Sequence, residues 1–182
     1  MSKKGKGMNV SGSLEEFRAE FNIPLSLNLH FVEDGEVNFI MGSPDKGEML
    51  LSKSYFEVDL KLPLPPLFKD IVNHLHLAPN QLCINMIRLT MSLAVLDHTR
   101  GLGISVIDVF YICTAMRSHI PHEWYMSPYL GMSCFIIGAP LTNKDLGRGL
   151  VVVSGKWEFG ISEPEGLPKV PRVHNVASVC QC

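Results

Sequence analysis

The histidines are the residues whose spacing would most readily bring acid–base or metal chemistry to this chain. The sequence holds seven of them: His30, His74, His76, His98, His119, His122 and His174. None follows the His-Glu-x-x-His spacing that sets two imidazoles on one helical face around zinc. His122-Glu123 has the residue types for acid–base catalysis, but its place directly after Pro121 is typical of a surface loop. The histidines therefore predict neither a catalytic site nor a metal site.

The cysteines predict buried thiols better than they predict a disulfide framework or a zinc site. Their number is odd and their spacing is wide: Cys83, Cys113, Cys134, Cys180 and Cys182. The first three lie among apolar residues and are expected in the core. Cys180 and Cys182 with His174 offer three ligands, whereas a structural zinc site uses four. A hydrolase that uses one of these thiols beside a histidine stays open as a hypothesis.

Two further segments resemble reactive motifs only in part. Ser154-Gly155 lacks the glycine two places before the serine that a nucleophile elbow of the Gly-x-Ser-x-Gly type has. Gly101-Leu-Gly103 lacks the third glycine and the lysine of a phosphate-binding loop, and is typical of a connection between helices. We therefore expect no enzymatic activity, with no catalytic, cofactor-binding or metal-binding residues and no cofactor.

The composition predicts one globular domain. The 182 residues include 46% hydrophobic and 19% charged residues, and the formal net charge is −2. This balance gives no overall electrostatic attraction to nucleic acid or to an anionic membrane. Neither an apolar stretch of the roughly 18–20 residues that span a bilayer nor the apolar part of a secretory signal is recognisable. We expect a soluble intracellular protein, in the cytoplasm or nucleus, that is not secreted and has no transmembrane segment.

The spacing of apolar residues predicts an α+β fold: a helix-rich single domain with a buried central helix and a small sheet. Ser13 and Glu16 form the pattern of a capping box at the first helix, and Pro66 suits the first turn of another. The region 55–64 is expected to be extended, and 121–128 to be a connection. The expected helices span 13–22, 66–77, 80–97 and 105–117, the central one being 80–97, and the expected strands span 25–32, 131–137 and 150–159.

One stretch of the chain carries a family resemblance. The segment Tyr55-Phe-Glu-Val-Asp-Leu-Lys-Leu-Pro-Leu-Pro-Pro-Leu-Phe-Lys69 is followed by Leu75-His-Leu-Ala-Pro-Asn-Gln-Leu82 and by the pair Asn85 and Arg88. In these motifs the chain resembles the gypsy-type transposon domain of plants, a domain of retrotransposon-derived proteins near their coat-forming, Gag-like part. The resemblance implies a domain at 13–172, between a flexible basic tail at 1–12 and a disordered tail at 173–182. It implies no catalytic residue.

Two hypotheses for the function follow from the residues and the resemblance. The first is a non-enzymatic structural or interaction domain of retrotransposon origin, either working or a truncated remnant of such an element, with self-association as one form of interaction. The alternative is a Gag-like protein that binds RNA or DNA through its basic tail and surface arginines. No partner is defined by the sequence, and no membrane is expected. The Asp-Thr/Ser-Gly motif of a retroelement protease and the zinc knuckle that grips packaged RNA are both absent from the sequence.

Overall fold

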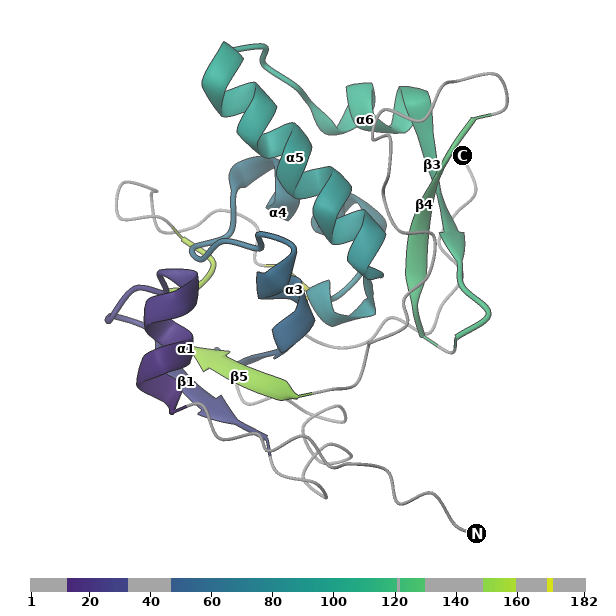
Figure 1. Ribbon diagram of the computed structural model, residues 1–182. Coiled ribbons are helices and arrows are strands. Elements are labelled where there is room, and N and C mark those ends of the chain that lie inside the picture. Colours follow the sequence, from purple (N-terminus) through teal and green to yellow (C-terminus); the bar gives the residue numbers. More distant parts are fainter. Residues whose placement is uncertain (1–12, 33–46, 121, 130–148, 160–169, 172–182) are drawn as a thin grey trace, which may run out of the picture.

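The computed structural model describes residues 13–32, 47–120, 122–129, 149–159 and 170–171 (Figure 1). Over these residues the fold is α+β, as predicted, with five α-helices, a three-stranded sheet and a two-stranded sheet. In chain order the elements are α1 (Leu14–Phe21), β1 (Asn28–Phe31), β2 (Met49–Ser52), α3 (Lys53–Glu57), α4 (Pro66–Leu75), η1 (Pro79–Gln81), α5 (Ile84–Arg100), α6 (Val106–Ile112), β3 (Cys113–Arg117), β4 (Trp124–Pro128) and β5 (Leu150–Ser154).

The three-stranded sheet places β5 between β1 and β2, and both pairings are antiparallel. The strand β5 is the central strand of this sheet. Its residues Val151 to Val153 form an apolar, β-branched run, which suits a buried strand. It ends at Ser154, where Gly155 takes a φ of +98°, so the predicted extension of the strand to 159 is wrong. Trp157 is fully buried beyond this turn, and its indole Nε1 donates to the Gly47 carbonyl at 2.8 Å.

The N-terminal helix and strand were both predicted, although the strand is shorter than expected. Ser13 accepts a hydrogen bond from the Glu16 amide and Glu16 accepts one from the Ser13 amide, which confirms the capping box. Phe17 then packs edge-on against Phe31, with ring centroids 5.5 Å apart. The expectation that Leu25 opens the strand is wrong, because this side chain is 89% exposed and β1 begins only at Asn28.

The segment before the proline-rich motif differs from the extended conformation predicted for 55–64. A strand, β2, comes first, and Ser52 at its end caps the short helix α3 by accepting a hydrogen bond from the Ser54 amide. Tyr55 and Phe56 are therefore helical, and both are buried. The apolar residues of this stretch can pack into the core from a helix or from an extended segment. Their pattern alone therefore did not distinguish the two conformations.

The helices α4 and α5 lie at the centre of the molecule and correspond to the predicted helices at 66–77 and 80–97 (Figure 1). The predicted bounds are not exact, because α4 ends at Leu75, residues 79–81 form a separate 3-10 turn, and α5 begins at Ile84 and ends at Arg100. Pro66 stands in the first turn of α4, and the Gln81 side chain accepts a hydrogen bond from the Ala78 amide at 3.1 Å in the turn that follows. The first half of α5 is buried, at Met86, Ile87, Thr90 and Met91. The prediction that this helix is buried throughout is wrong, because residues 92–100 are exposed or only partly buried.

The region after α5 contains the largest error of the sequence-based assignment. The helix predicted at 105–117 stops at Ile112, and Cys113–Arg117 is a strand, β3, which pairs antiparallel with β4. The connection predicted at 121–128 therefore contains a strand. Five pairs of facing residues, from Cys113 opposite Pro128 to Arg117 opposite Trp124, stabilise this hairpin. The spacing of apolar residues along the sequence does not indicate this cross-strand pairing. The strand predicted at 131–137, the loop at 33–46 and the tails 1–12 and 173–182 lie outside the described residues.

Candidate interaction site

The second half of α5 and the helix α6 are held at a fixed angle by polar contacts in their connection. Gly101 ends α5 in the left-handed conformation with a φ of +61°. The Asp97 carboxylate accepts a hydrogen bond from the Ile104 amide at 2.8 Å. Ser105 and Asp108 then cap α6 with reciprocal hydrogen bonds.

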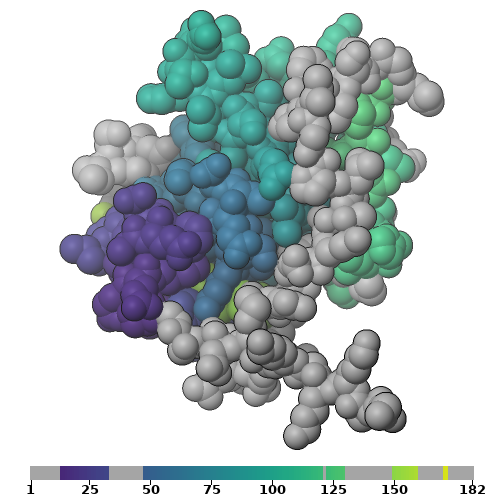
Figure 2. All heavy atoms as spheres, viewed as in Figure 1, coloured from purple at the N-terminus to yellow at the C-terminus, as the bar shows by residue number. Residues whose placement is uncertain are grey.

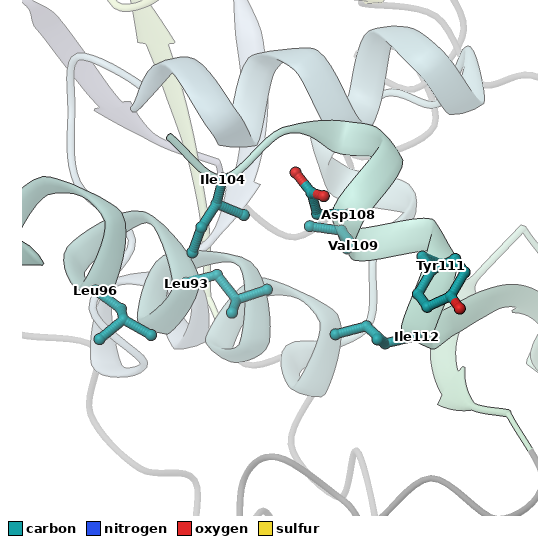
Figure 3. Close-up of a pocket in the computed structure, with 7 residues that line it drawn as sticks. All are labelled: Leu93, Leu96, Ile104, Asp108, Val109, Tyr111 and Ile112. Carbon is teal, nitrogen blue, oxygen red and sulfur yellow. The ribbon is translucent and has the colours of Figure 1, made fainter. Parts of the chain in front are cut away.

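An open hollow of about 320 Å³ lies between these two helices. Its lining is apolar except for one carboxylate, and the close-up shows the side chains around the opening (Figure 3): Leu93, Leu96, Ile104, Asp108, Val109, Tyr111 and Ile112. We name these residues, together with the neighbouring Leu102 and Ile107, the α5–α6 face. In the space-filling view the teal atoms at the C-terminal end of α5 reach the upper edge of the molecule, while the purple helix α1 lies at the lower left (Figure 2).

The α5–α6 face exposes large apolar side chains to solvent. Ile107 is 79% exposed, Tyr111 is 76% exposed and Leu102 is 57% exposed. Ile107 and Tyr111 are four residues apart on α6 and so lie on one side of that helix. Since Val109, on the other side, is buried in the core, α6 is apolar on both sides. Large exposed apolar patches often mark interaction sites in soluble proteins.

The charges at this face have opposite signs at different places. Hydrogen bonds from Ser105 lower the pKa of the Asp108 carboxyl group, so the fully exposed side chain is negative at neutral pH. Arg100, which is exposed, lies one helical turn beyond Leu96 at the C-terminal end of α5. The face therefore has a negative charge in the first turn of α6 and a positive charge at the C-terminal end of α5.

The buried polar groups in the core serve structural contacts. The Tyr55 hydroxyl donates to the Leu82 carbonyl at 2.7 Å, which ties α3 to the turn before α5. Burial raises the pKa of Tyr55 well above its usual range, with smaller contributions from the charges of Cys83 and Glu123. The Cys83 sulfur accepts a hydrogen bond from the Met86 amide at 3.4 Å, so this thiol caps α5. The prediction that Cys83 and Cys113 are buried is confirmed, while Cys134, Cys180 and Cys182 lie outside the described residues.

The histidines that the structure describes are all exposed. His119 and His122 lie in the connection between β3 and β4, which confirms their predicted surface position, and His74 stacks on Phe110 with ring centroids 4.9 Å apart. Within the described ranges, no three His, Cys, Asp or Glu side chains lie close enough together to hold a metal ion. His174 falls outside these ranges.

The residues of the proline-rich motif fill the core instead of forming a site. Phe68 and Ile71 are fully buried, and the Leu62-Pro63 peptide bond is cis. Asn85 and Arg88 lie partly buried on the first half of α5.

The sequence matches no family profile, no curated protein and no solved structure. In the parts of the chain that the structure describes, every helix is too short or too polar to cross a membrane.

Proposed function

We propose that this chain is a non-enzymatic structural and interaction domain of a retrotransposon-derived protein of the plant gypsy type, which binds another polypeptide through the α5–α6 face. The proposal includes an intracellular location, in the cytoplasm or nucleus. The origin is supported by the Leu-Pro-Leu-Pro-Pro and Ala-Pro-x-Gln-Leu motifs. The interaction is supported by one observation above all: an open, mostly apolar hollow between α5 and α6 whose lining includes Tyr111, a side chain that is 76% exposed.

The non-enzymatic part of the proposal is supported by how the reactive side chains are used. The Tyr55 hydroxyl and the Cys83 thiol, two groups capable of nucleophilic chemistry, are buried and hydrogen-bonded to backbone atoms. A catalytic nucleophile instead stands beside a base in a position that a substrate can reach. The hollow between α5 and α6 has a single carboxylate, on Asp108, and that group already accepts hydrogen bonds from the Ser105 amide and hydroxyl at the start of α6.

The α5–α6 face can be tested for binding with an apolar dye. We expect anilinonaphthalene sulfonate to bind the folded chain at low protein concentration and to fluoresce, because the hollow removes the dye from water. Leu96→Glu places a charge in the hollow and should abolish most of the signal. Leu25→Glu is the matched control. Leu25 is also an exposed leucine, with an exposed fraction of 89%, but it lies between α1 and β1, so its replacement should leave the signal unchanged. Equal dye binding by both variants would refute the proposed site.

The same purified chain also serves to distinguish binding through the α5–α6 face from the alternative function, which is binding of RNA or DNA. A domain that binds through phosphate contacts shows an affinity for labelled single-stranded RNA that falls steeply with salt. A domain that works through the apolar face shows dye binding that salt hardly changes. We expect the second behaviour, and a steep salt-dependent RNA affinity that Leu96→Glu leaves intact would favour the alternative instead.

A further inference from the structure

We infer that the occupant of the α5–α6 face is a second copy of this chain, bound across a two-fold axis. This inference rests on the proposed function, since it names the partner for the same face. It follows from three properties of the described residues: the shape of the face, its area and the placement of its charges.

The shape of the face is self-complementary. The hollow is bounded by Leu93, Leu96 and Ile104 and by Tyr111, whose side chain is 76% exposed (Figure 3). Ile107 lies four residues before Tyr111 on α6 and is 79% exposed. A volume of about 320 Å³ is enough for one or two such side chains. In a two-fold dimer the same patch is used by both copies, so the projecting side chains of each copy enter the hollow of the other. An aromatic side chain that fills an apolar pocket is also the usual centre of binding energy.

The area of the face is sufficient for a weak dimer. From the exposed fractions of Leu96, Leu102, Ile107 and Tyr111, together with their partly buried neighbours, each copy presents roughly 500–600 Å² of apolar surface. Two copies would bury about 1,000–1,200 Å² in total, at the lower limit for specific interfaces. We therefore expect a dissociation constant of about 1–100 µM.

The charges of the face fit another copy better than a membrane or a nucleic acid. Asp108 is negative and Arg100 is positive, so an antiparallel arrangement can bring the cation of each copy toward the anion of the other. An anionic lipid surface or a phosphate backbone would require several cations around the hollow, and the one charged side chain that lines it is the Asp108 carboxylate.

Sedimentation equilibrium of the full chain tests the inference, over about 1–200 µM to cover the expected dissociation constant. Wild type should pass from monomer to dimer in this range. Ile107→Glu should raise the dissociation constant at least about tenfold, because the carboxylate would be buried in the apolar contact. Tyr111→Ala should weaken the dimer similarly, and Leu25→Glu should not change it. Ile107, Tyr111 and Leu25 are each more than 75% exposed, so none of the changes should prevent folding.

The outcomes separate the inference from the function on which it rests. A wild-type chain that stays monomeric, or a dimer that Ile107→Glu does not weaken, overturns the inference. If that monomer still binds the dye in a manner that Leu96→Glu abolishes, the face is an interaction site for a different polypeptide. If it binds no dye, the proposed function fails as well.

Discussion

Replacing Tyr55 with phenylalanine should destabilise the fold by a predictable amount. The variant keeps the buried ring and loses only the hydroxyl group, which donates to the Leu82 carbonyl at 2.7 Å in the core. The loss of a buried hydrogen bond that leaves its acceptor unsatisfied costs about 1–2 kcal/mol. With a urea dependence of about 2 kcal/mol/M, the unfolding midpoint should fall by about 0.5–1 M. Tyr111→Phe is the matched control, because that side chain is 76% exposed and its midpoint should stay within error of wild type.

The pH dependence of the same pair of proteins provides a second, independent readout. The pKa of Tyr55 is raised in the folded state, so its contribution to stability is complete below the unfolded pKa of about 10 and declines as the pH rises above it. By pH 11 wild type should lose about 1.4 kcal/mol from this group, whereas Tyr55→Phe has no such loss. The difference in unfolding free energy between the two should therefore shrink by that amount. If wild type and Tyr55→Phe have the same unfolding free energy at pH 7, or if their difference in unfolding free energy stays constant up to pH 11, the assignment of this hydrogen bond is refuted.

Two further stability predictions follow from the described core and caps. Phe68→Ala should cost about 3–5 kcal/mol of unfolding free energy, because a fully buried ring leaves a cavity in the centre of the fold; a cost below 1 kcal/mol in urea unfolding would contradict the placement of α4. Ser13→Ala should cost about 1 kcal/mol, because the Glu16 amide loses its acceptor at the start of α1. Ser13→Asp should keep most of that stability in the same assay, and an equal loss in both variants would contradict the cap.

The starts of the helices that carry a sequence-encoded cap were predicted closely. The Ser13 and Glu16 pair, Pro66 and the Ser105 and Asp108 pair mark the starts of α1, α4 and α6, because capping depends on residues within one turn of the helix. The glycine at 101 marks the end of α5 for the same reason. Local chemistry of this kind can be recognised without knowledge of the tertiary structure.

The elements that depend on distant residues were not predicted. Thr114 to Arg117 continue the apolar spacing of α6, and only their pairing with Trp124 to Ser127 makes them a strand. The strand β2 was missed because Met49–Ser52 is four residues long and pairs with β5, about a hundred residues later. Tertiary pairing overrides local preference in both places.

The α5–α6 face was missed for a related reason. The apolar residues of 80–97 and of 105–117 were taken as core, since a helix that is hydrophobic on all sides is usually buried. A signal was nevertheless present in α6. Ile107 and Tyr111 lie on the side opposite Val109, so the apolar residues of this short helix do not share one face and cannot all be buried in the same core.

Light scattering of the purified full chain, at low and high salt and with or without single-stranded RNA, tests the central claim most directly. The claim is that the α5–α6 face joins two copies of the domain through apolar contact. It predicts a mass that rises with protein concentration toward twice the 20.2 kDa of one chain, whether or not RNA is present and at either salt concentration. A mass that stays at one chain, or that grows only with RNA and only at low salt, would contradict it.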